Sequence, residues 1–135
     1  MFTGHIAVWF EIPAADLARA SAFYQTVFAI EMPITGPEDM RMAMFPHGEN
    51  TISGCLSACG GVKPSTDGST VYLNGGADLA VPLGRIEAAG GKVLLPKTAI
   101  PDYPGFFAHF LDSEGNRVGL YSEVAPLDWT EFPVS

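Results

Sequence analysis

The sequence predicts an α+β fold in which two βαβββ modules pair, so that their curved sheets form a cleft. The main observation is that the tetrapeptide ADLA occurs twice, at 15–18 and at 77–80. Each copy follows a strand-like run, supplies an aspartate able to cap a helix, and precedes three further strand-like runs. Because a unit this short cannot bury its sheet alone, the duplication predicts that two units pair.

The length of 135 residues suits one domain with a well-buried core. We expect a single domain over 1–135, made of the modules 5–57 and 69–122, the linker 58–68 and the C-terminal tail 123–135. The linker, ACGGVKPSTDG, has three glycines, a proline and no apolar period. The tail carries Trp129 and Phe132, which we expect to dock on a surface.

The first module begins with a strand over 5–12, a run rich in β-branched and aromatic residues that ends at Pro13. Asp16 stands where an N-cap belongs, and apolar residues then recur at helical spacing, which predicts an amphipathic helix over 16–28. The remaining three strands of this module are expected at 30–34, 40–45 and 51–57.

The second module repeats this order, with a strand over 69–74 and a helix that Asp78 caps and Gly90 ends. Its last three strands are expected at 92–95, 106–111 and 117–122. The segment PKTAIPDYPG is expected to form a proline-rich excursion. DSEGN predicts a hairpin turn, because Gly115 and Asn116 tolerate left-handed backbone angles.

Composition narrows the possible partners. The formal net charge of −8 argues against nucleic acid and anionic membrane surfaces. No apolar run reaches the ~18 residues of a membrane span, and the N-terminus resembles a strand rather than a signal peptide, so the cytoplasm is the expected location. The two cysteines, Cys55 and Cys59, are expected to be reduced and inert there.

Three stretches, WFEIPAADLARASAFYQTVF, GGADLAVPLGRIEAAGGKVL and FFAHFLDSEGNRVGLYS, resemble the glyoxalase/bleomycin-resistance/dioxygenase family, the vicinal oxygen chelate superfamily. The resemblance covers about 5–122 and is nearest to the group related to lactoylglutathione lyase. It implies paired modules around a cleft, in which His, Glu or Gln side chains hold a divalent metal. The metal acts as a Lewis acid on two neighbouring oxygens of the substrate.

The resemblance also implies where metal ligands would stand. The best register places those positions at Ala7, at Gly54 (or Leu56), at Thr70 (or Ser69) and at Gly119. Alanine and glycine side chains cannot coordinate a metal, and a shift by one residue brings in no set of ligands. We therefore expect no metal and no other cofactor.

Aromatic residues are the more informative candidates. Side chains on a strand alternate between its two faces, so some aromatic residues are expected on the same face as the positions implied for metal ligands and therefore in the cleft. These are Trp9, Tyr72, Phe110 and Tyr121. Tyr103, in the proline-rich excursion, could close over them. The same rings could instead fill the cleft as core, and the sequence alone leaves both alternatives open.

Polar candidates are few. Glu11 shares the parity of Trp9 and could act as a base, or pair with Arg19 or Arg117. His5 could reach the cleft mouth or be a solvated strand end. If Asp112 pairs with Arg117 in the hairpin, Phe110 faces Gly119, and His109 points to the other face of the sheet.

Three functions therefore remain open. The leading one is a metal-independent protein of this superfamily that binds a small apolar or aromatic molecule in its cleft and works as a homodimer. The second is a lyase, isomerase or dioxygenase-related enzyme whose base is Glu11 or His5. The third is a non-catalytic subunit with a filled cleft. Since fold resemblance does not fix function, the choice needs the geometry of the site.

Overall fold

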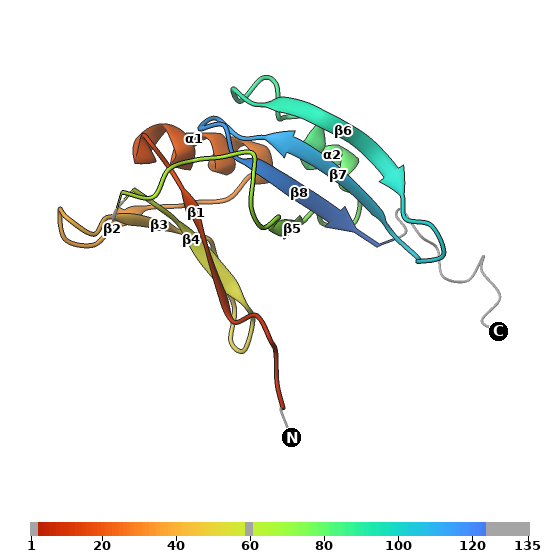
Figure 1. Ribbon diagram of the computed structural model, residues 1–135, viewed down its shortest axis with the longest axis horizontal. Helices are drawn as coiled ribbons and strands as arrows, with labels where there is room; N and C mark the ends of the chain where they lie inside the picture. Colours follow the sequence, from red (N-terminus) through yellow and green to blue (C-terminus); the bar gives the residue numbers. More distant parts are fainter. Residues whose placement is uncertain (1–2, 59–60, 124–135) are drawn as a thin grey trace.

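The structure is a computed structural model that describes residues 3–58 and 61–123, and it contains two four-stranded sheets with helices on one side of them (Figure 1). The first module comprises β1 (Trp9–Pro13), α1 (Leu17–Phe28), β2 (Ile34–Thr35), β3 (Met42–Met44) and β4 (Ser53–Ser57). The second comprises β5 (Tyr72–Asn74), α2 (Ala80–Leu83), β6 (Lys92–Ala99), β7 (Phe106–Leu111) and β8 (Arg117–Ser122). The predicted α+β class and element order are confirmed.

The two sheets have equivalent topologies. The strand order is β1-β4-β3-β2 in the first sheet and β5-β8-β7-β6 in the second. In each, the opening strand lies parallel to the closing strand of its module, and the other pairs are antiparallel. The second ADLA copy therefore marks a repeated structural unit. The tail residues Trp129 and Phe132 lie outside the described residues, as does Cys59.

Helix α1 forms as the sequence predicts. The Asp16 carboxylate accepts a hydrogen bond from the backbone N–H of Arg19, which satisfies one of the unpaired donors of the first turn. The apolar face buries Phe23, Tyr24 and Val27 against the sheets. The ring of Tyr24 lies 5.4 Å from that of Phe45 in the first module and 6.5 Å from that of Phe110 in the second. This helix thus packs against both modules.

Several strands are shorter than expected: β1 and β5 begin later, at Trp9 and Tyr72, and β2 comprises only Ile34–Thr35. Two other elements also differ in extent. Helix α2 is only one turn long, and its N-cap is Leu79 rather than the predicted Asp78. The Asp78 carboxylate lies one residue earlier and accepts a hydrogen bond from the backbone N–H of Ala80. Strand β6 continues past its expected end to Ala99 and so includes the first four residues of the proline-rich excursion. Pro96 is tolerated because β6 is an edge strand with shifted register between Leu95 and Thr98.

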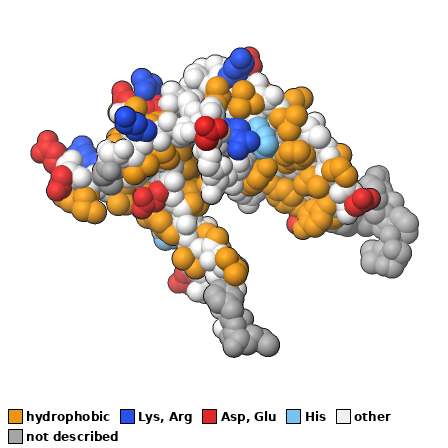
Figure 2. All heavy atoms as spheres, in the orientation of Figure 1, with side chains coloured by type: hydrophobic (Ala, Val, Ile, Leu, Met, Phe, Trp, Pro, Cys, Tyr) orange, Lys and Arg blue, Asp and Glu red, His pale blue; other side chains and the backbone are white. Residues whose placement is uncertain are grey.

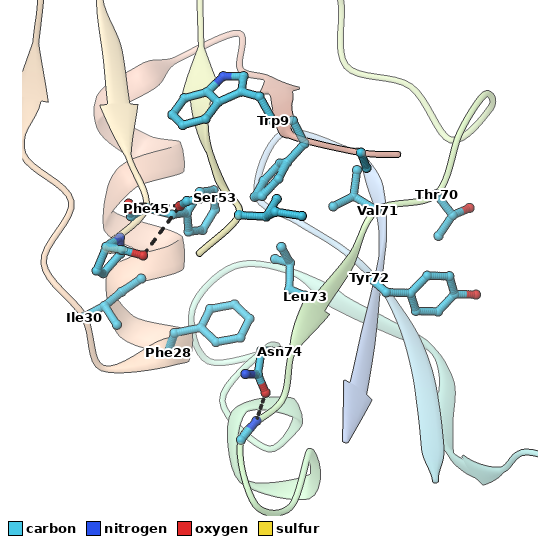
Figure 3. A pocket seen from close by; sticks show the side chains of 15 residues that line it. Trp9, Phe28, Ile30, Phe45, Ser53, Thr70, Val71, Tyr72, Leu73 and Asn74 are labelled. Atoms are coloured by element: carbon cyan, nitrogen blue, oxygen red, sulfur yellow. Dashed lines mark hydrogen bonds between the residues drawn. The ribbon is translucent and has the colours of Figure 1, made fainter. Parts of the chain in front are cut away.

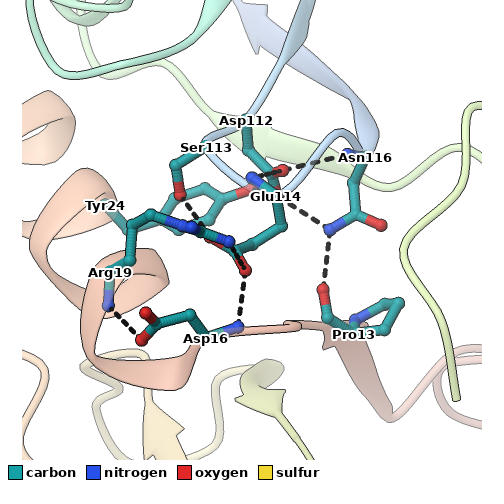
Figure 4. A network of polar contacts seen from close by, with 8 residues as sticks. All are labelled: Pro13, Asp16, Arg19, Tyr24, Asp112, Ser113, Glu114 and Asn116. Atoms are coloured by element: carbon teal, nitrogen blue, oxygen red, sulfur yellow. Dashed lines mark hydrogen bonds and ion pairs between the residues drawn. The ribbon is translucent and has the colours of Figure 1, made fainter.

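The junction between the modules is a buried carboxylate in the β7–β8 turn (Figure 4). Asp112 is 3% exposed, and its Oδ2 accepts hydrogen bonds from the Tyr24 hydroxyl at 2.8 Å and the Asn116 amide at 2.9 Å. Its Oδ1 accepts from the backbone N–H groups of Glu114 and Asn116. The Asn116 amide also donates to the carbonyl of Pro13, at the end of β1. One carboxylate thereby links the turn, α1 and β1.

A second contact strengthens the junction. Arg19 forms an ion pair with Glu114 at 2.7 Å, and the backbone N–H of Asp16 donates to the same carboxylate. Burial alone would raise the pKa of Glu114, but the hydrogen bonds from Arg19, Asp16 and Ser113 outweigh it and lower the pKa. Glu114, rather than Glu11, is therefore the partner of Arg19.

The modules are joined at this end and spread apart at the other. Figure 1 shows the two sheets diverging from the region of the turn, so the molecule has the shape of an arch. Figure 2 shows the surface hollowed between the two sheets, with apolar side chains gathered on the exposed face of the second sheet. Within the described residues, no helix is long and apolar enough to span a membrane.

We predict that Tyr24→Phe lowers the free energy of unfolding by about 1.5–3 kcal/mol, because a buried carboxylate loses a hydrogen bond. Burial and the nearby Asp112 raise the pKa of Tyr24 well above 10.0, so its hydroxyl remains a donor at neutral pH. A urea titration measures the change. Tyr103→Phe is the control, since that ring is 61% exposed. Equal stability of the two variants would contradict the role of this junction.

Candidate functional site

The candidate site lies on the faces of the sheets that point away from the helices, which we call the inner faces. On the second sheet the register brings Tyr72, Gly119 and His109 side by side, with Tyr121 and Phe107 paired in the next row. The alternate residues, Val118, Leu120 and Ala108, are buried in the core under the helices. The inner face of the second sheet is therefore largely aromatic.

An aromatic ring covers the glycine at the centre of this face. A Cβ atom at Gly119 would lie only 2.4 Å from Cδ1 of Tyr72, so the Tyr72 ring occupies the space that a side chain at 119 would need. The hydroxyl of Tyr72 is 2.8 Å from Nε2 of His109, and the Phe107 ring packs edge-on against the imidazole. Partial burial, followed by the charge of Arg117, lowers the pKa of His109, which keeps its ring neutral at pH 7.

Beside this ring lies an apolar hollow of about 340 Å³, lined by Tyr72, Ile100, Phe107 and Tyr121. The Tyr121 hydroxyl donates to the carbonyl of Pro104, and partial burial, with Tyr103 and Glu123 nearby, raises the pKa of Tyr121. Tyr103 stands in the β6–β7 loop, is 61% exposed, and is not among the residues that line the hollow. The sequence-based suggestion that it closes over the site stays a prediction.

A larger cavity of about 760 Å³ lies between β1 and β4 of the first module and β5 of the second, and we call it the seam cavity. Its walls include Trp9, Phe10, Phe28, Phe45, Ile52, Val71 and Leu73. Figure 3 shows Val71 and Leu73 turned towards the first module, whereas Thr70 and Tyr72 point to the other side of β5. Cavities of this volume with apolar walls are typical of small-molecule sites.

Two residues, Phe110 and Gly54, lie on the opposite face of their sheet from the one that the sequence predicts. Asp112 pairs with Asn116 rather than with Arg117, so Phe110 pairs with Val118 and is fully buried in the core. A shift of one residue exchanges the two faces of a strand, and His109 is therefore on the inner face in place of Phe110. Gly54 also points towards the helices, where the Phe10 ring covers it, and Cys55 takes its place on the inner face.

Other predicted residues lie at the rim. Trp9 is 43% exposed and lines the seam cavity together with Ala7 and Thr70. Glu11 shares the inner face of the first sheet with Trp9, is exposed, and forms no ion pair with Arg19 or Arg117. His5 is exposed and precedes β1. The structure does not bring Glu11 or His5 together with the aromatic hollow of the second sheet.

Arg117 is a candidate site residue that the sequence analysis missed, since it considered Arg117 only as an ion-pair partner of Glu11. Its Nη2 donates to the Thr70 hydroxyl at 2.8 Å, and its buried Nε has no hydrogen-bond partner. The cation thus stands beside one of the four positions implied for metal ligands. The signal in the sequence was the hairpin register, since Arg117 lies two residues before Gly119 and on the same face.

The residues present do not fit the metal that the fold implies. Ala7 and Gly119 offer no donor atoms, and the Thr70 hydroxyl already binds the cation of Arg117, which would repel a metal ion. The Tyr72 ring fills the space over Gly119. Across 3–58 and 61–123, no three His, Cys, Asp or Glu side chains are grouped so that they could hold a metal.

Comparison with known proteins supports the fold assignment. A model of the bleomycin resistance protein-like N-terminal family matches residues 7–48, most of the first module. No protein of curated function matches the sequence. TnmS3, an antibiotic binding protein from Streptomyces sp. CB03234, is 21% identical, with a TM-score of 0.68 over 91% of this chain and 98% of that one.

Two similar structures are enzymes. Lactoylglutathione lyase from Agrobacterium tumefaciens is 19% identical, with a TM-score of 0.60 over 89% of this chain and 95% of that one. Glyoxalase I from Zea mays is also 19% identical, with a TM-score of 0.64 over 84% of this chain and 44% of that one. The chain thus spans less than half of the maize enzyme. At these identities the likeness establishes the fold and leaves the activity open.

We predict that Gly119→Ala destabilises the protein by about 1–3 kcal/mol, because the new methyl group collides with the Tyr72 ring. In a Tyr72→Ala background the same change should be neutral, or stabilising by up to about 1 kcal/mol, since alanine loses less backbone entropy than glycine. Denaturant titrations of the four proteins measure this coupling. An equal cost in both backgrounds would show that the ring does not occupy the space.

Proposed function

We propose that this chain, a member of the vicinal oxygen chelate superfamily by its fold, binds a small apolar or aromatic molecule at its inner face without a metal ion. The observation that carries the proposal is the Tyr72 ring over Gly119, at a position where the superfamily places a metal ligand. An aromatic surface stands there in place of a chelator. The antibiotic-binding neighbour TnmS3 supports the same kind of function.

The affinity would come from burial of apolar surface and from contact between rings. Burial contributes roughly 25 cal/mol per Å² of apolar area. A well-placed pair of rings adds about 0.5–1.5 kcal/mol to this. Trp9 and Tyr72 offer such rings in the seam cavity, and Tyr72 also lines the neighbouring hollow together with Phe107. The seam cavity of about 760 Å³ favours an open site over a filled cleft.

We predict that Trp9→Ala weakens binding of an aromatic ligand, found by a thermal-shift screen, about tenfold or more, because it removes a ring from the seam cavity. Since Trp9 is 43% exposed, the variant should lose less than the roughly 3–5 kcal/mol that a core aromatic costs. Calorimetric titration and urea denaturation give the two quantities. Val81→Ala, on α2, is the control. Large destabilisation with no hits would favour the filled cleft.

We also predict that the purified protein binds aromatic hits with unchanged affinity after treatment with a chelator. The reason is that Ala7 and Gly119 provide no ligands at the positions the superfamily uses. Elemental analysis should find no stoichiometric zinc, nickel, manganese or iron. Stoichiometric metal, with binding lost on chelation, would favour the enzymatic alternative.

The working unit in this proposal is a homodimer. Just before β1, the side chains of Ile6 and Val8 are 87% and 70% exposed. Ile52, which precedes the neighbouring strand β4, is 44% exposed. A cluster of exposed apolar side chains such as this one, at the end of the first sheet, is typical of a protein–protein interface. A second copy is the partner of matching chemistry, since β1 also has a free edge in the first sheet.

We therefore predict twice the mass of one chain by light scattering at micromolar concentration, and loss of the dimer in Val8→Asp. Val62→Asp serves as the control, because Val62 is 62% exposed, close to the 70% of Val8, but lies in the loop before β5. A monomer at the same concentration in the unmodified protein would count against the dimer.

A further inference from the structure

We propose that the ligand of this site is an aromatic acid, whose ring lies on the inner face of the second sheet while its carboxylate is bound by the guanidinium of Arg117. This inference rests on the proposed function and adds the charge of the ligand to it. It starts from the arrangement of polar and apolar side chains along three neighbouring strands.

Along β8, the residues that point to the inner face begin with the cation Arg117 and continue towards the aromatic residues. Arg117 pairs with Leu111, and Gly119 and Tyr121 follow along β8, paired with His109 and Phe107. Successive rows on one face are about 6.6–7 Å apart. The row of Tyr72 and His109 is therefore one step from Arg117, whereas the row of Tyr121 and Phe107 is two steps away, about 13–14 Å. A ring that lies against Tyr72 thus brings a carboxylate, one or two bonds away, towards Arg117.

The guanidinium has hydrogen-bonding capacity left for a ligand. Nη2 donates to the Thr70 hydroxyl, and Nε is enclosed with no partner. Nη1 makes no hydrogen bond in the described part of the chain and, unlike Nε, is not fully buried. A carboxylate can accept from Nη1 and Nη2 together, the planar geometry that arginine favours.

Within the described residues, no carboxylate forms an ion pair with this arginine. The described residues form two ion pairs, Arg19 with Glu114 and Lys97 with Asp78, and neither involves Arg117. Glu11 and Asp67 line the recess around Arg117 without pairing with it. A half-buried cation with only a neutral hydroxyl as partner is poorly compensated, and an anionic ligand would supply the missing charge.

The pair formed by Tyr72 and His109 gives a second polar contact between the cation and the rings. Where the Tyr72 hydroxyl donates to Nε2, the proton of the neutral imidazole is on Nδ1, which can then donate to a ligand oxygen. The net charge of −8 opposes anions at long range. Preference for an acid must therefore arise from local contact with Arg117.

The test compares aromatic acids with their neutral amides by isothermal titration calorimetry, using benzoate, 2-naphthoate and 9-anthracenecarboxylate against the matching carboxamides. We expect the acid of the best-binding pair to bind at least tenfold more tightly than its amide. In Arg117→Gln the ratio of the two affinities should fall to near one. Arg41→Gln, which removes an equal charge from an exposed position outside the site, should retain the ratio.

The outcomes separate the two proposals. Amides that bind as tightly as the acids would overturn the inference and leave the proposed function standing. Binding by none of the six compounds would overturn both. If Arg117→Gln does not fold, Arg117→Lys keeps the charge without the planar pair of donors, and the ratio should fall at least threefold. An unchanged ratio in that variant, with no weakening of acid binding in 0.5 M salt (about a 4 Å Debye length), would also contradict the inference.

Discussion

The buried carboxylate of Asp112 is the contact on which the arrangement of the two modules depends. It accepts four hydrogen bonds, from Tyr24 of α1 and from Asn116 and Glu114 of its own turn, and Asn116 extends the network to the end of β1. An unsatisfied group at this depth would be costly, so the turn and the helix are held in one relative position. Because the contact lies at one end of the sheets, their other ends are free to diverge and leave the seam cavity.

The glycines opposite the first strand of each module explain how the inner faces differ. Phe10 covers Gly54 on the side of the helices, where its ring joins the core beside Phe45. In the second module Tyr72 covers Gly119 on the inner face. The same arrangement thus adds a ring to the core in one module and to the inner face in the other. A side chain large enough to bind a metal could not stand at 119 without displacing the ring.

The sequence predicts the architecture well because the repeat, the Asp16 cap and the turn beginning at Asp112 are local signals. It predicts less well which face of the sheet a single residue occupies. The turn contains one residue fewer than expected, so every residue of β7 changes face relative to β8. His109 and Phe110 exchange roles for this reason. The seam cavity depends on contacts between segments far apart in the chain, and neither periodicity nor composition encodes its volume.

The central claim is that an aromatic ring binds on the inner face of the second sheet, where the superfamily fold would hold a metal. Intermolecular nuclear Overhauser effects between an aromatic hit and the isotopically labelled, chelator-treated protein test this most directly. The account predicts contacts from the ligand ring to Tyr72, Phe107 and Tyr121. Contacts confined to the helical side of the sheets, or binding that appears only after a divalent metal is added, would contradict it.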